Sequence, residues 1–133
     1  MYNVGKRKLF KRDDSFAKRA KYTMKIFVGL GNPDKKYQKT YHNAGSIALN
    51  ALWEEIKDGV EILRESELPL FSFTEFREPK LGEKIIFAIS KTYMNESGGA
   101  VREILKFFRA MPSDLIILHD DSDLILGNSK FTE

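Results

Sequence analysis

Three short, nearly continuous apolar runs, at residues 24–28, 84–89 and 115–118, limit the folds open to this chain. Runs of this length, closed by Gly, Asn, Pro or Asp residues, are typical of buried β-strands that end in loops. Strands that alternate with amphipathic helices predict an α/β fold, in which helices cover both faces of a twisted sheet. The helical spacing i, i+3, i+4 and i+7 occurs twice between the runs, at Leu49, Leu52, Trp53 and Ile56, and at Val101, Ile104, Leu105 and Phe108.

The middle of the chain predicts a β-hairpin. Residues 71–76 contain three phenylalanines and look extended, residues 79–83 offer a turn, and residues 84–89 form the next apolar strand. The run at residues 115–118 is apolar at every position, which favours a central strand that is buried on both faces. We therefore expect one α/β domain with a twisted, mixed and mainly parallel sheet flanked by helices.

Polar residues follow three of the predicted strands, at ends that should lie together. Asn32 follows the first strand, Asn95 follows the strand that ends at residue 89, and Asp120 follows the run at 115–118. In open α/β sheets, ligands bind beyond the carboxyl ends of the parallel strands, because the loops diverge there and leave a crevice. The sequence thus predicts one shared site at this end of the sheet.

His42 is one of two histidines and lies directly before the first predicted helix. Its neutral imidazole could take a proton from water near pH 7, and the carboxylate of Asp120 could hold the ring and stabilise the imidazolium. Taken alone, a histidine at a helix start is more often a surface or capping residue. An aspartate after a strand is likewise more often a loop residue.

Other chemistries fit the sequence less well. The segment HDDSD at residues 119–123 has metal-binding residue types, but neighbouring residues that leave a strand point in alternating directions and do not converge. The glycines at 29 and 31 resemble the start of a dinucleotide-binding loop, yet Asp34 stands in place of the third glycine and Pro33 interrupts the turn. No serine or cysteine lies in a nucleophile-elbow motif. We expect water as the nucleophile, with no metal and no cofactor.

The positive charge of the chain is concentrated at its N-terminus. Residues 1–22 hold eight Lys or Arg and two Asp, a charge of +6, so the rest carries −3 of the total of +3. We expect residues 1–23 to be a basic, disordered extension that contacts RNA, is a solvated tail, or precedes a true start at Met24. No apolar run approaches the roughly 20 residues of a membrane span, and cysteine is absent, which favours a protein of the cytoplasm with no membrane association.

Four ordered motifs resemble the successive signatures of the bacterial-type peptidyl-tRNA hydrolase family. They are GLGNP at 29–33 with Tyr37, TYHNAG at 40–45, KTYMNESG at 91–98, and HDDSDL at 119–124 with Gly127. The resemblance implies a monomeric esterase of translation that acts on peptidyl-tRNA. It also implies roles for single residues: His42 as catalytic base, Asp120 as its partner, contacts to the peptide and the tRNA 3′ end at Asn32, Tyr37, Met94 and Asn95, and a tRNA phosphate contact at Lys130.

The resemblance has gaps as well as matches. Asp34 replaces the glycine usual after the Asn-Pro pair, and Tyr41 replaces the basic residue usual before the His-Asn pair. The chain also ends before the family's glycine-rich His-Asn-Gly loop, lid and final helix, so we expect residues 24–133 to be the N-terminal part of such a domain. The main alternative is a truncated, inactive or weakly active fragment that at most binds RNA through its basic arm. A nucleotide-binding module, which rests only on the glycines, ranks last.

Overall fold

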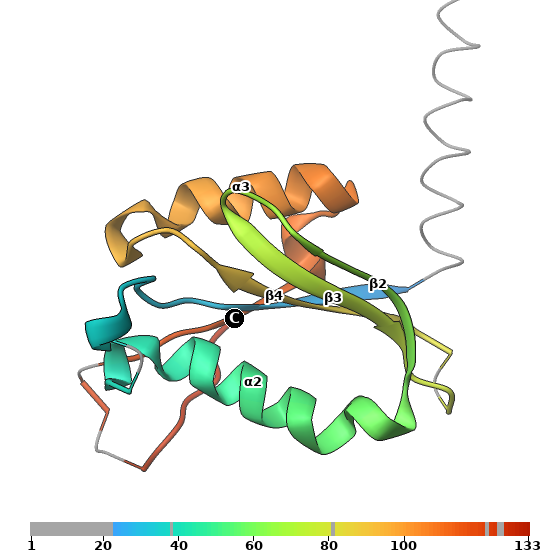
Figure 1. Ribbon diagram of the computed structural model, residues 1–133, viewed down its shortest axis with the longest axis horizontal. Helices are drawn as coiled ribbons and strands as arrows, with labels where there is room; N and C mark the ends of the chain where they lie inside the picture. The colour runs from blue at the N-terminus through green and yellow to red at the C-terminus, as the bar shows by residue number, and fades with distance from the viewer. Residues whose placement is uncertain (1–22, 38, 81, 122, 125–126) are drawn as a thin grey trace, which may run out of the picture.

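The computed structural model contains a five-stranded sheet of order β2-β3-β4-β1-β5, with helices α2 and α3 on opposite faces (Figure 1). It describes residues 23–37, 39–80, 82–121, 123–124 and 127–133, so the predicted extension over residues 1–23 lies almost entirely outside the described residues. The strands are β1 (Met24–Gly29), β2 (Glu61–Glu67), β3 (Phe71–Arg77), β4 (Lys84–Ser90) and β5 (Leu115–Leu118). The helices are α2 (Ala44–Ile56) and α3 (Ser97–Phe108), with 3-10 helices η1 (Lys35–Tyr37), η2 (Tyr41–Asn43), η3 (Lys57–Gly59), η4 (Met94–Glu96) and η5 (Pro112–Asp114). None of the described helices has the length and apolar character needed to cross a membrane.

The strand pairing confirms the predicted mixed α/β sheet. Strand β1 pairs in parallel with β4 and β5, and the predicted hairpin is present as the antiparallel pair β3–β4. A second antiparallel pair, β2–β3, raises the antiparallel share to two of the four described pairs. The parallel part of the sheet is therefore the three-stranded unit β4-β1-β5.

The two edge strands differ from the sequence expectation. Strand β2 was not predicted, because its sequence EILRESE lacks an apolar run, and all seven residues are exposed at the sheet edge. The prediction that residues 115–118 form a central strand is wrong for the described residues, in which β5 is also an edge strand. It pairs only with β1, and the side chain of Ile117 is 41% exposed.

Each face of the sheet has its own apolar core. On the α3 side, Ile104 packs against buried residues of β1, β3 and β4, namely Ile26, Val28, Phe71, Phe73, Ile86 and Ala88. On the α2 side, Leu49 packs with Phe76 and Phe87, and Trp53 adds an edge contact to Phe87. Leu52 was predicted on this inward face, but it is exposed because the helix presents Leu49, Trp53 and Ile56 to the sheet instead.

A buried carboxylate lies on the α3 side of strand β3. The side chain of Glu75 is 8% exposed and accepts from Arg64 at 2.8 Å and from Lys84 at 3.0 Å. Burial alone would raise the pKa of Glu75, but the hydrogen bonds and charges of Lys84 and Arg64 outweigh it and hold the pKa below its ordinary value. Glu75 therefore ties edge strand β2 and strand β4 to β3 through charge-assisted hydrogen bonds.

We expect Glu75→Gln to destabilise the fold at neutral pH by on the order of 1 to 2 kcal/mol, since a charge-assisted hydrogen bond of this kind contributes about that much. A carboxyl group whose pKa is lowered by folding stabilises the protein above its unfolded pKa, and this contribution is lost as the pH falls through the folded pKa. The difference between wild type and variant should therefore be constant at neutral pH and shrink below the ordinary value of 4.5. Urea unfolding at a series of pH values measures it.

Glu55→Gln is the matched control, because this glutamate lies on the exposed side of α2. It should change the free energy of unfolding little at any pH. A Glu75→Gln deficit that stayed constant down to pH 3 would contradict the ion-pair explanation.

Candidate active site at the carboxyl end of the sheet

Four segments meet where the parallel strands β1, β4 and β5 have their carboxyl ends. They are the loop after β1, the turn η2 before α2, the loop after β4 and the loop after β5, and they gather at the left side of Figure 1. This is the end of the sheet that the sequence predicted for a shared site. Hydrogen bonds link residues of these four segments in pairs.

His42 and Asp120 form the titratable pair of this cluster. The His42 Nδ1 lies 3.3 Å from Asp120 Oδ2, although the two residues are 78 positions apart in the chain. The side chain of Asp120 is 19% exposed and that of His42 is 52% exposed, so the imidazole is open to solvent while the carboxylate is largely covered. When Nδ1–H donates to the carboxylate, Nε2 becomes the basic nitrogen of the ring. The predicted pairing of these two residues is therefore present in the structure.

Asn43 joins the loop after β1 to the turn that carries His42. The Asn32 backbone N–H donates to Asn43 Oδ1 at 2.7 Å, and Asn43 Nδ2 donates to the Asn32 carbonyl oxygen at 3.0 Å. Asn43 is 7% exposed, and its side chain makes no capping hydrogen bond to α2 although it directly precedes that helix. Both polar groups of the amide are thus used to fix the backbone of Asn32 relative to His42. Sequence reasoning did not identify Asn43 as a site residue.

Asn32 also reaches the loop after β4. Its Oδ1 accepts a hydrogen bond from the Met94 backbone N–H at 2.9 Å, across 62 residues of sequence. Beside this contact, the Tyr93 hydroxyl donates to Asp34 Oδ1 at 3.3 Å. The aspartate that replaces the family's usual glycine therefore adds a second link between the same two loops, which sequence reasoning also missed.

Glycines allow these segments to approach one another closely. A Cβ atom at Gly31 would lie 2.6 Å from Asn43 Oδ1, and one at Gly29 would lie 2.9 Å from the Cα of Ser46 in α2. A Cβ atom at Gly45 would overlap the carbonyl group of Leu118, at the end of β5. That carbonyl oxygen accepts from the Leu30 backbone N–H at 3.0 Å, which continues the β1–β5 pairing into the site. The start of α2 thus packs directly on backbone at the strand ends.

The other predicted site residues are Asn95, Tyr37 and Lys130, and the structure describes them to different extents. Asn95 lies in η4 next to Met94, with its side chain exposed. Tyr37 belongs to η1, and its side chain lies outside the described part of the structure. Lys130 is exposed in the C-terminal segment 127–133, and within the described residues it makes no hydrogen bond or ion pair with the cluster. The structure therefore brings together His42, Asp120, Asn32 and Met94 and does not bring Lys130 to them.

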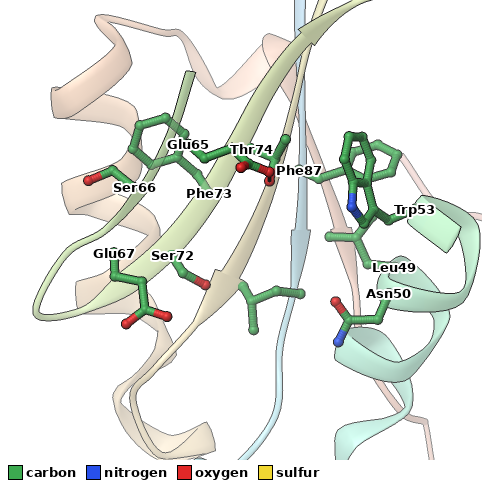
Figure 2. Close-up of a pocket in the computed structure, with 11 residues that line it drawn as sticks. Leu49, Asn50, Trp53, Glu65, Ser66, Glu67, Ser72, Phe73, Thr74 and Phe87 are labelled. Atoms are coloured by element: carbon green, nitrogen blue, oxygen red, sulfur yellow. Dashed lines mark hydrogen bonds between the residues drawn. The ribbon is translucent and has the colours of Figure 1, made fainter. Parts of the chain in front are cut away.

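A separate hollow of about 400 Å³ lies between α2 and the strands β2 and β3 (Figure 2). Its apolar side includes Leu49, Trp53 and Phe87, and its polar side includes Glu65 and Glu67 from the edge strand. The residues brought together at the strand ends, His42, Asp120, Asn32 and Met94, do not line this hollow. Because its lining holds no paired acid and base, the strand ends and not this hollow are the candidate active site. Among the described residues, no three His, Asp or Glu side chains are grouped as a metal site would require.

Comparisons with known proteins give one consistent result. The family profile described as peptidyl-tRNA hydrolase matches residues 26–133. Curated relatives with that name include one from Brevibacillus brevis, 38% identical over 110 residues, and one from Lactobacillus delbrueckii subsp. bulgaricus, 44% identical over 107 residues. These alignments cover 83% and 80% of this chain and 55% of each relative, so the chain spans about half the length of the curated relatives it matches. The crystal structure of peptidyl-tRNA hydrolase from Acinetobacter baumannii is similar with a TM-score of 0.64 at 29% identity, covering 77% of this chain and 50% of that one.

Proposed function

The chain belongs to the peptidyl-tRNA hydrolase family, and from that premise we propose that it hydrolyses the ester bond between tRNA and a peptide or N-blocked aminoacyl group. The observation that carries the proposal is the His42–Asp120 pair, which lies at the same sheet end as Asn32 and Met94. The reaction would recycle tRNA in translation, in the cytoplasm, and we propose that the protein acts as a monomer without metal or cofactor.

The proposed reaction uses His42 as general base and then as general acid. His42 Nε2 takes a proton from a water molecule while the water oxygen attacks the ester carbonyl carbon, and a tetrahedral intermediate forms. The intermediate collapses, the bond from the carbonyl carbon to the ribose oxygen breaks, and the imidazolium returns its proton to that oxygen. The products are a free carboxyl group on the peptide and a hydroxyl group on the tRNA. Asp120 holds the ring in the required tautomer and stabilises the imidazolium.

Asn32, Met94 and Asn95 are the proposed substrate contacts at the reacting ester. Asn32 Oδ1 already accepts a hydrogen bond from the Met94 backbone N–H. Within the described residues, the Nδ2 group of Asn32 can therefore donate a hydrogen bond to a substrate oxygen. A preorganised donor of this kind favours the developing oxyanion without reorganisation during the reaction. Asn43 fixes the Asn32 backbone, so we assign it a positioning role. We keep Tyr37 and Lys130 as further contacts to the tRNA, proposed from the resemblance.

A second candidate function is RNA binding without cleavage. The observation that favours it is that the chain covers 55% of its curated relatives, while eight Lys or Arg lie in residues 1–22. The two candidates differ in one measurement, because only the first one releases free tRNA from an N-acetyl-aminoacyl-tRNA substrate. Binding of that substrate without release of tRNA would favour the second.

We expect the chain to cleave N-acetyl-aminoacyl-tRNA at an unchanged rate after exhaustive chelation. The described site offers one imidazole and one carboxylate in contact, which suits a water activated by a base and not by a metal ion. Release of deacylated tRNA, measured with and without a strong chelator, tests this. Added Zn²⁺ or Mg²⁺ is the control and should not raise the rate of the chelated protein. Loss of cleavage on chelation that is restored by metal would overturn the proposed mechanism.

A further inference from the structure

Three lysines lie on the loop that connects the Asn32 turn to His42. Lys35 and Lys36 begin η1, Lys39 follows it, and all three side chains are exposed. The 3-10 helix η1 contacts η2, which carries His42, so these lysines lie at the rim of the active site (Figure 1, blue-green segment at the left). We propose that this η1 lysine cluster (Lys35, Lys36 and Lys39) binds backbone phosphates at the 3′ end of the RNA and so holds the strand beside His42. The inference rests on the proposed function for the identity of the RNA.

The charges around the site favour this placement. The loop after β5 carries Asp120, Asp121 and Asp123, so the part of the site formed by that loop is negatively charged. A polyanion is repelled by that loop and attracted to the η1 lysine cluster, and the summed charges of a protein surface steer a charged ligand in this way. The RNA would therefore cross the site on the η1 side, with its ester end directed toward His42.

Other cations of the chain are less suited to this task. Lys91 follows β4 at the same end of the sheet, but its ammonium group donates to the Leu68 carbonyl oxygen at 3.1 Å and lies 3.8 Å from Glu67. Within the described residues, the η1 lysine cluster is a basic group that lies next to the turn that carries His42.

The test compares two double variants of the full chain, Lys35→Glu/Lys39→Glu and Lys80→Glu/Lys106→Glu. Each Lys→Glu exchange changes the formal charge by two units, so both variants change it by four, but Lys80 lies in the β3–β4 turn and Lys106 near the end of α3, away from the site. The probe is a labelled RNA hairpin with a single-stranded CCA 3′ end, and fluorescence anisotropy gives its affinity at several salt concentrations. The probe carries no ester, so the result does not depend on cleavage, and every variant retains residues 1–22.

We expect the η1 variant to bind the hairpin at least tenfold more weakly than the control variant at low salt. Its plot of log affinity against log salt should also be less steep by about 1.4 to 1.8, because two phosphate contacts each contribute roughly 0.7 to 0.9 to the slope. The neutral variant Lys35→Gln/Lys39→Gln should show the same reduced slope and the thermal unfolding of wild type, which excludes a folding defect as the cause.

Three results would overturn the inference. Wild type that does not bind the hairpin, or two Glu variants with equal affinities, would show that the lysine cluster makes no local phosphate contact. Displacement of the hairpin by inorganic phosphate, at a concentration where the same ionic strength of chloride has no effect, would assign the cluster to a free anion. Failure of the proposed hydrolysis appears separately, as absence of tRNA release from N-acetyl-aminoacyl-tRNA, and leaves this binding result unchanged.

Discussion

Replacing His42 by alanine should lower the rate of N-acetyl-aminoacyl-tRNA cleavage by about a hundredfold to ten thousandfold, the range that a positioned general base supplies. The imidazole is the basic group that Asp120 contacts at 3.3 Å, and it carries out both proton transfers of the proposed reaction. The substituted side chain is about half exposed, so its removal should leave the free energy of unfolding nearly unchanged. Single-turnover release of tRNA measures the chemical step, and urea unfolding measures the stability of the variant.

Two further variants separate the roles within this cluster. Asp120→Ala should reduce the rate less than His42→Ala, because the imidazole base is still present, although it loses both the carboxylate that sets its tautomer and the negative charge that stabilises its protonated form. His119→Ala is the matched control, since this exposed histidine contacts the Asp120 carbonyl oxygen and not the carboxylate. It should leave cleavage close to wild type. Normal turnover by His42→Ala, or equal losses in the His42 and His119 variants, would disprove the assignment of His42 as the base.

Much of the fold was predictable because a continuous apolar run in the sequence indicates a buried strand. Strands β1 and β4 bury alternate side chains against helices on both faces of the sheet, which requires the near-continuous apolar runs that were read from the sequence. Strand β2 has no such requirement, because it lies at the edge and pairs with β3 through charged residues such as Arg64. Its seven residues therefore resemble a polar loop, and an edge strand of this kind gives no apolar signal in a single sequence.

The candidate active site was predicted in part for a related reason. Parallel strands place their carboxyl ends together, so the proximity of His42 and Asp120 followed from the order of strands and motifs. The role of Asn43 did not follow, because an asparagine directly before a helix is typical of an N-cap. In the structure its amide turns to the Asn32 backbone instead. Side-chain direction at a helix start depends on what packs beside it, and that information is tertiary.

The second large effect is expected at Gly45, in the first turn of α2. Replacing it with alanine should destabilise the fold by about 3 kcal/mol or more, at or above the upper end of the usual cost of overpacking. The new Cβ atom would lie 2.6 Å from the Leu118 carbonyl carbon and 3.0 Å from the Leu30 backbone nitrogen, and these are backbone atoms that cannot rotate away. Helix α2 would have to move away from β1 and β5, so the geometry of His42 relative to Asp120 should be lost as well.

Gly98→Ala provides a control with the opposite expected sign. This glycine lies in the first turn of α3, and a Cβ atom there would meet nothing within 4 Å, so alanine should keep or raise stability by up to about 1 kcal/mol through its higher helix propensity. Thermal and urea unfolding of the two variants, together with tRNA release by each, test the prediction directly.

If Gly45→Ala unfolds at the same urea concentration as wild type, the close contact between α2 and the strand ends is not what positions His42. If it unfolds early but Gly98→Ala does as well, the loss reflects glycine replacement in general and not this contact. Only early unfolding confined to Gly45→Ala, with cleavage reduced in parallel, supports a site whose acid–base geometry depends on a helix packed directly on the strand backbone.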